Sequence, residues 1–145
     1  MTHIRTQIRE SLRDALAAAL TGYDVYSSRK YAKNITTKPM VDMRFLNENV
    51  EAETMGSERR RTASLYLRVQ RHAPETQIDD LLDNDEIVVN DVVMSNWWDG
   101  LLAEPPEQMQ VNWSDTDQGG SIIGSIVLRY DVEYRVDQID LENAR

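Results

Sequence analysis

Residues 125–136 read S-I-V-L-R-Y-D-V-E-Y-R-V, and their side chains alternate between two kinds. A strict period of two in β-branched and aromatic residues predicts a strand with one face buried and the other solvated. A slip of one residue would turn every apolar side chain outward, so this strand sets the register of its neighbours. We therefore expect its apolar positions to form the core of the fold: Ile126, Leu128, Tyr130, Val132 and Tyr134.

The rest of the chain alternates between helical and strand periods. Apolar residues at three- and four-residue spacing predict a helix over residues 1–20, with Thr2 as its cap and Gly22 as its stop. A period of two predicts further strands at residues 23–28, 40–45, 62–70 and 108–113, followed by a turn at residues 115–120. Helical spacing returns over residues 76–102. We expect an interruption at residues 83–85, because β-branched residues follow them. A helical hairpin or one interrupted helix would serve equally as the cover of the sheet.

This order of elements predicts an α+β fold. We expect an antiparallel sheet of four to five strands, covered by the N-terminal helix and the central helical segment. A chain of 145 residues is long enough for one domain with a real core, which we place at residues 1–136, followed by a polar tail at residues 137–145. The polar connection at residues 46–60 is longer than a typical hairpin loop, so we expect it to be mobile and suspect it of function.

The net charge of -9 conceals a basic half and an acidic half: residues 1–71 hold 13 Lys/Arg against 8 Asp/Glu, whereas residues 72–128 hold 12 Asp/Glu and no Lys/Arg. Charge runs of this kind are usually solvated loops. The alternative is a subunit whose basic side faces the acidic side of an identical neighbour, as a head-to-tail contact requires. The residues proposed for such a contact with a neighbour or another partner are Lys30, Lys33, Lys38, Arg59, Arg60, Arg61, Asp79, Asp80 and Asp83.

The residues that usually form catalytic or metal sites are sparse. The chain has no cysteine, and its two histidines, His3 and His72, are isolated, so neither a zinc site nor a nucleophile with a base is recognisable. A calcium loop beginning at Asp115 fails at its fifth position, Gly119, and at its twelfth, Ile126. The apolar run at residues 15–20 is too short for a membrane span and follows several charges, which excludes a signal peptide. We expect no enzyme and no cofactor.

Five segments, which together run from residue 11 to residue 136, resemble a known family. They are S-L-R-D-A-L-A-A-A-L, P-M-V-D-M-R-F, A-S-L-Y-L-R-V, I-D-D-L-L and, most specifically, the finish D-T-D-Q-G-G-S-I-I-G-S-I-V-L-R-Y-D-V-E-Y-R-V. In order and pattern they are similar to the tail terminator proteins of long-tailed, siphovirus-type phages, the minor tail protein U family. The chain departs from that family in a longer segment at residues 83–98 and an extra helical turn at the start.

The resemblance implies a structural protein that forms a ring, typically of six subunits, on the last ring of the tail tube. Such a ring stops tube polymerisation and offers the surface on which the filled head docks. The implied partners are further copies of the chain, the tail tube protein and a head completion or neck protein, with residues 46–60 as the expected tube contact. Genome DNA would cross the ring without sequence-specific binding, because an acidic wall repels phosphate. The implied location is the head-proximal end of the virion tail, and the host cytoplasm during assembly.

Two alternatives remain open at this point. One is another head–tail connector or completion protein, which would also assemble into a ring but would dock on the portal side. The other is a small soluble enzyme whose site the sequence does not reveal.

Overall fold

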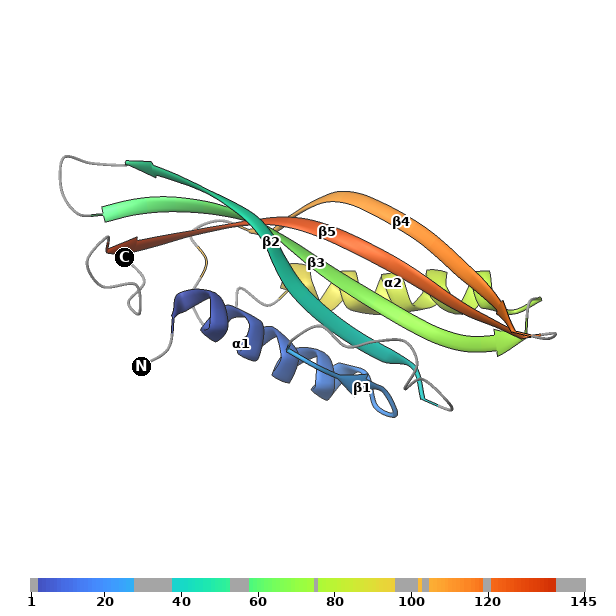
Figure 1. Cartoon of the computed structure of the whole chain (residues 1–145). Helices are drawn as coiled ribbons and strands as arrows, with labels where there is room; N and C mark the ends of the chain where they lie inside the picture. Colours follow the sequence, from blue (N-terminus) through green and yellow to red (C-terminus); the bar gives the residue numbers. More distant parts are fainter. Residues whose placement is uncertain are drawn as a thin grey trace.

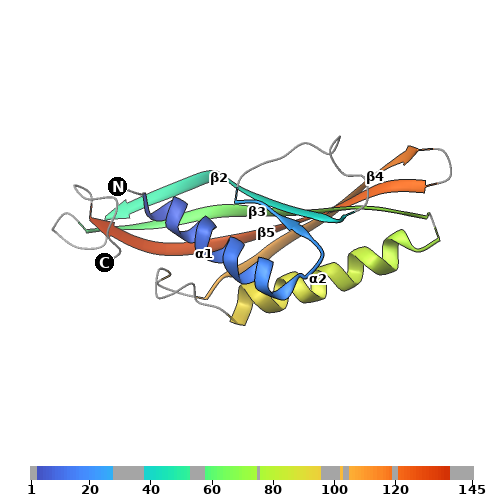
Figure 2. The same cartoon turned by 90° about the horizontal axis from the view of Figure 1, so that it is seen from below.

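The computed structural model describes residues 3–27, 38–52, 58–74, 76–95, 102, 105–118 and 121–137. They form one α+β unit in which two helices lie on the same face of a five-stranded sheet (Figures 1 and 2). The elements are α1 (Ile4–Ala19), β1 (Asp24–Val25), β2 (Met40–Ala52), β3 (Glu58–Pro74), α2 (Ile78–Ser95), β4 (Glu107–Gln118) and β5 (Ser121–Asp137). The strands are ordered β1-β2-β3-β5-β4 across the sheet.

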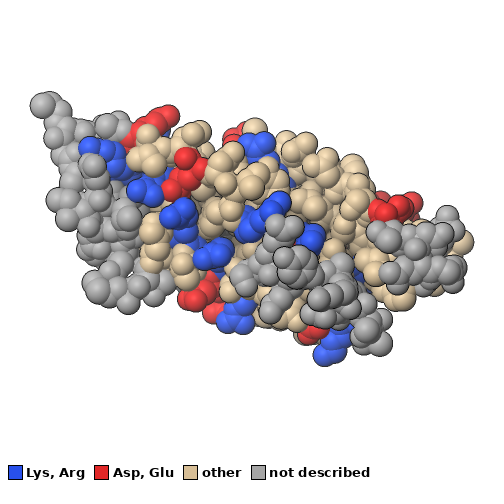
Figure 3. Space-filling view, viewed as in Figure 1, with Lys and Arg blue, Asp and Glu red and all other residues tan. Residues whose placement is uncertain are grey.

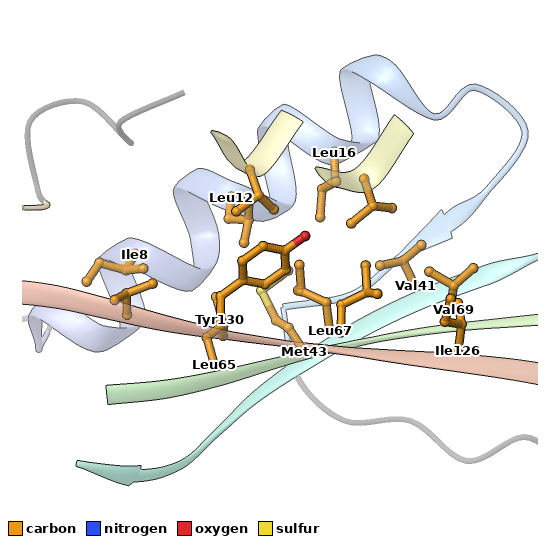
Figure 4. Packing of buried hydrophobic residues seen from close by; sticks show 14 of the residues in the cluster. Ile8, Leu12, Leu16, Val41, Met43, Leu65, Leu67, Val69, Ile126 and Tyr130 are labelled. Carbon is orange, nitrogen blue, oxygen red and sulfur yellow. The ribbon is translucent and has the colours of Figure 1, made fainter. Parts of the chain in front are cut away.

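The long final strand lies between β3 and β4. It pairs with β3 along its full length, from Ser121 to Asp137. All five predicted core residues, from Ile126 to Tyr134, have no exposed surface, which confirms the prediction. In Figure 4, Leu12 and Leu16 of α1 lie on the helix side of the sheet, with the Tyr130 ring between them and the strands.

The N-terminal helix packs on the sheet through one stripe. Its buried side chains are Ile4, Ile8, Leu12 and Leu16, each four residues from the next, and burial of such side chains stabilises a fold by roughly 1.5–3 kcal/mol each. The helix begins after His3, whose Nδ1 accepts a hydrogen bond from the Arg5 backbone N–H at 3.0 Å. The predicted cap, Thr2, lies outside the described residues. After the helix, Gly22 adopts a φ of 83°, a left-handed conformation that suits glycine at a helix end.

The central helix is continuous where an interruption was predicted. Helix α2 runs without a break through residues 83–85, so that prediction is wrong. Tertiary packing outweighs the weaker helix propensity of this stretch. The buried residues of α2 recur at three- and four-residue spacing along the whole helix: Ile78, Leu82, Asp85, Val89 and Val93. At its start α2 comes so close to β5 that a Cβ on Gly124 would lie 2.5 Å from Ile78 Cγ1. The predicted continuation at residues 96–101 lies outside the described residues.

Three strand predictions also need correction. The sheet is mixed, because β1 pairs in parallel with β2, and β1 has two residues where residues 23–28 were predicted. Residues 46–60 are mostly strand: β2 continues to Ala52 and β3 begins at Glu58, with Glu51 paired to Arg60. A register shift between Phe45 and Glu48 interrupts the period of two, which concealed this extension from sequence inspection. Residues 115–118, predicted as turn, belong to β4.

The extension carries the strands past the start of α1, although Ala63, Val132 and Tyr134 at its base stay buried. We call it the arm: residues 45–52 of β2, 58–64 of β3 and 131–137 of β5. Figure 1 shows these strand ends running past the start of α1.

Candidate interaction surfaces

The predicted contact residues lie at opposite ends of the molecule. Arg59, Arg60 and Arg61 stand at the start of β3, on the arm. Asp79, Asp80 and Asp83 stand on exposed positions of α2, which begins just after β3 ends. Because 14 residues of β3 follow Arg60 up to its end at Pro74, roughly 45 Å of strand separates the arginines from the start of α2. The basic residues themselves are not brought together, since Lys38 precedes β2 at the α2 end of the sheet, and Lys30 and Lys33 lie outside the described residues.

The arm arginines Arg60 and Arg61 have partners within the chain. Arg60 forms ion pairs with Glu51 at 2.5 Å and with Glu133 at 3.6 Å. Arg61 donates a hydrogen bond to Glu48 at 2.8 Å, and its side chain is only 15% exposed. Arg61 therefore stabilises the arm, whereas Arg60 remains accessible for a contact outside the chain. Towards the left of Figure 3, Lys/Arg and Asp/Glu side chains lie close together on the surface.

The acidic residues of α2 have a structural explanation as well. Asp79 and Asp80 occupy the first helical turn, where the helix dipole stabilises negative charge by typically ~0.3–1 kcal/mol. Asp83 is exposed one turn later, and its charge is not accounted for in this way. The exposed carboxylates leave this end of the molecule acidic, which suits a basic partner.

A buried cluster that the sequence did not predict anchors α2. Asp85 accepts two hydrogen bonds from Arg71, at 2.9 Å from Nε and 2.8 Å from a terminal nitrogen, and a third from the Tyr23 hydroxyl. Arg71 also donates to the Tyr23 hydroxyl and lies 5.2 Å from the centre of its ring. Burial and the hydrogen bond to Asp85 raise the pKa of Tyr23 to about 12. The signal was present in the sequence, because Asp85 falls on the apolar stripe of α2.

A second cluster of a carboxylate, an arginine and a tyrosine lies at the base of the arm. The Tyr134 hydroxyl donates to Glu48 Oε1, and Arg61 donates to Glu48 Oε2. Arg5 of α1 comes within 3.9 Å of the same carboxylate. Burial, and then the bond to Glu48, raise the pKa of Tyr134 above its ordinary value. The cluster fills the helix side of the sheet where the aliphatic core ends.

The helix-free face of the sheet contains a polar hollow of about 290 Å³. Within it Arg68 Nε lies 3.2 Å from Asp42 Oδ1, and Asp42 is only 3% exposed. Gln70 is 6% exposed, and its Oε1 has no hydrogen-bond partner. Among the described residues, no group of three or more His, Cys, Asp or Glu side chains could hold a metal ion. The hollow therefore offers polar side chains for contact but no recognisable catalytic arrangement.

Large apolar side chains are exposed on both edges of the sheet and on α2. Leu46 and Val50, on β2, are 55% and 51% exposed. Met109 and Trp113, on β4, are 48% and 60% exposed. On α2 the most exposed is Ile87, at 67%. Exposed apolar side chains grouped in this way mark candidate contact surfaces.

Comparison with models of known protein families and with curated proteins gives no match for this sequence. Within the described part of the chain, neither helix is long and apolar enough to cross a membrane.

Proposed function

We propose that this chain is a structural protein of a phage virion. In this proposal its copies form a ring, of six subunits by the family resemblance, that caps the tail tube, ends tube growth and provides the head-docking surface. The ring acts without catalysis or a cofactor, and genome DNA passes through its lumen. It assembles in the host cytoplasm and stays at the head-proximal end of the tail.

One observation supports this proposal above the others: the acidic start of α2 and the arginine-bearing arm lie at opposite ends of one long sheet. Copies that lie side by side in one orientation, as the heterologous contacts of a ring require, would then give the ring two unlike faces, one for the tube and one for the head. Complementary potentials would also favour the correct partner at each face over other partners. The surplus of acidic residues suits a passage for DNA, because negative charge repels phosphate.

The arm is the part of the molecule that we assign to the tail tube. It replaces the mobile loop expected from sequence at residues 46–60, and it projects past both helices as paired strands (Figure 1). A preformed projection loses less conformational entropy on docking than a loop that must order first. Arg60, at 41% side-chain exposure, is an arm cation that a partner could reach.

The test is to mix the purified protein with growing tail tubes and examine them by electron microscopy. We expect caps at tube ends and tubes that stop lengthening. Binding to portal-bearing heads, with tubes left free to grow, would instead identify a connector that docks on the portal side. A protein that stays monomeric at all concentrations and salt levels, and ignores both structures, would contradict assembly of any kind.

Arg60→Glu tests the role assigned to the arm. We expect weaker capping of tubes in this variant, because an accessible cation becomes an anion next to Glu51 and Glu133. Arg13→Glu is the matched control, since Arg13 is similarly exposed, at 43%, but lies on α1 away from the arm. Equal capping by both variants would remove the arm from the tube contact.

A further inference from the structure

The two free edges of the sheet differ in what they leave unpaired. Strand β4 ends the sheet on one side, and its residues 107–115 are exposed or half-buried throughout. On the other side β1 covers only Met40 and Val41 of β2, so in the described part of the chain no strand pairs with the outer edge of residues 43–52. Edge strands present unpaired backbone N–H and C=O groups to any strand that approaches.

The geometry points to direct pairing of these two edges between neighbouring copies: β4 of one copy adds to residues 43–52 of β2 in the next. The inference rests on the proposed function, because it names the contact that joins the subunits of the ring. Each sheet would then continue into the next one around the ring.

Strand directions allow this pairing without turning a subunit over. Strand β2 is antiparallel to β3, β3 to β5, and β5 to β4. It follows that β4 runs opposite to β2. A copy placed alongside in the same orientation would therefore bring β4 antiparallel to β2, which continues the alternation already present within each copy.

Exposed apolar side chains on the two edges face the same side. Trp113 pairs with the buried Ile126, so it points to the helix-bearing face. Val50 pairs with Arg61, which in turn pairs with the buried Tyr134, so Val50 points to that face too. An aromatic side chain opposite a β-branched one is a favourable cross-strand pair, worth roughly 0.2–1 kcal/mol relative to two alanines. The pairing would cover two side chains that are now more than half exposed.

Charge favours β2 over a second β4 as the partner. Strand β4 contains Glu107, Asp115 and Asp117 and no lysine or arginine. Two β4 strands paired about Asn112 would place Glu107 opposite Asp117, and like charges directly opposite destabilise a sheet. On the β2 edge, by contrast, arginines of β3 neutralise both glutamates, and Arg44 adds a further cation.

The two edges are offset along the strands. Strand β4 lies level with residues 121–131 of β5, whereas the uncovered part of β2 lies level with about residues 128–136. Full pairing therefore shifts each copy along the strand direction by roughly 20–25 Å. A closed ring absorbs such a shift when its strands tilt relative to the ring axis, as the strands of barrels do by about 35–45°.

Disulfide trapping tests the pairing. Because the chain has no natural cysteine, only the introduced cysteines can form a disulfide. Asn49 and Asn112 are exposed and lie on the helix-free face, opposite Thr62 and Val127 respectively. We expect an oxidised mixture of Asn49→Cys protein with Asn112→Cys protein to give covalent dimers. Gln110→Cys and Ser114→Cys replace Asn112→Cys in parallel mixtures, so that neighbouring registers are covered.

The possible outcomes distinguish a failure of the edge pairing from a failure of ring assembly. Rings in the electron microscope without cross-links in any mixture would overturn the edge pairing and leave the ring intact. Cross-linking of a β4 cysteine variant with itself would overturn it in favour of a two-fold contact. A chain that remains monomeric by analytical ultracentrifugation would overturn both proposals.

Lysine substitutions give an independent measurement. Trp113→Lys and Val50→Lys each place a charge on one edge, and we expect the dissociation constant for self-association to rise by at least about tenfold in each. Ile87→Lys is the control, because Ile87 is as exposed as either residue but lies on α2. Thermal unfolding followed by circular dichroism verifies that all three variants fold. An equal loss of association in Ile87→Lys would overturn the edge pairing.

Discussion

The two buried clusters of carboxylate, arginine and tyrosine have the same composition but join different parts of the chain. Asp85, Arg71 and Tyr23 come from α2, the end of β3 and the connection after α1, up to 62 positions apart. Glu48, Arg61 and Tyr134 come from adjacent strands, which backbone pairing already holds side by side. The first cluster therefore determines where a helix sits, whereas the second reinforces a contact that the sheet has already made.

The carboxylates of the two clusters also differ in burial. The Asp85 side chain is 4% exposed and that of Glu48 is 11% exposed. When one member of a buried ion pair is removed, the charge that remains must be rehydrated or stay uncompensated, and the cost grows with burial. We therefore expect the two clusters to contribute unequally to stability, although each joins a carboxylate to an arginine and a tyrosine.

The largest effect is expected from Asp85→Ala. This change leaves the Arg71 guanidinium, 17% exposed, without its bidentate partner and should lower the free energy of unfolding by roughly 3–5 kcal/mol. Urea unfolding measures the loss. Asp83→Ala, an exposed change two residues earlier, should stay within about 0.5 kcal/mol of the parent. Similar losses in the two variants would mean that the cluster does not anchor α2.

A smaller effect is expected from Glu48→Ala. Strand pairing persists without this side chain, so the loss should be that of hydrogen bonds to a charged group, roughly 1.5–3 kcal/mol. The matched control is Glu51→Ala, since Glu51 is 61% exposed and forms a surface ion pair worth roughly 0–1 kcal/mol. If Glu48→Ala proved as costly as Asp85→Ala, the proposed contrast between the clusters would be wrong.

The smallest effect concerns alkaline pH. The pKa of Tyr23 is about 12 in the folded protein and near 10 when unfolded, so its contribution is fully present below pH 10 and is lost as pH rises to 12. Tyr23→Phe should therefore weaken the decline in stability between pH 10 and pH 12, measured as the urea midpoint against pH. Tyr26→Phe is the control, as Tyr26 is half-buried nearby. An unchanged slope in Tyr23→Phe would contradict the role of this hydroxyl.

Several features of the fold could be predicted from residue order alone. The alternation around Tyr130 identified a buried strand and its inward face. The stripe from Ile4 to Leu16 identified the first helix and the side it buries. These predictions hold because a period of 2 or 3.6 residues is a local property, and the hydrophobic effect acts on whichever face is apolar.

The extent of the strands and the partners of the charged residues depended on tertiary structure. The shift after Phe45 hid the arm, because a bulge breaks the period while the neighbouring strand keeps the pairing. Arg60 and Arg61 looked like free cations until the register placed Glu51 and Glu48 beside them. Of the predicted contact residues, the structure separates the arginines from the aspartates of α2, and Lys30 and Lys33 lie outside the described residues.

Residue order thus determined which side chains are buried and in which kind of element, since both follow from composition and period within a short window. It could not determine that Asp85 belongs with Arg71 and Tyr23, or that β2 and β4 are left at the sheet edges. Those facts arise from contacts between residues far apart along the chain. Such contacts form only when the packed core has brought the elements together. The periodicity of residues within a short stretch of sequence therefore cannot predict them.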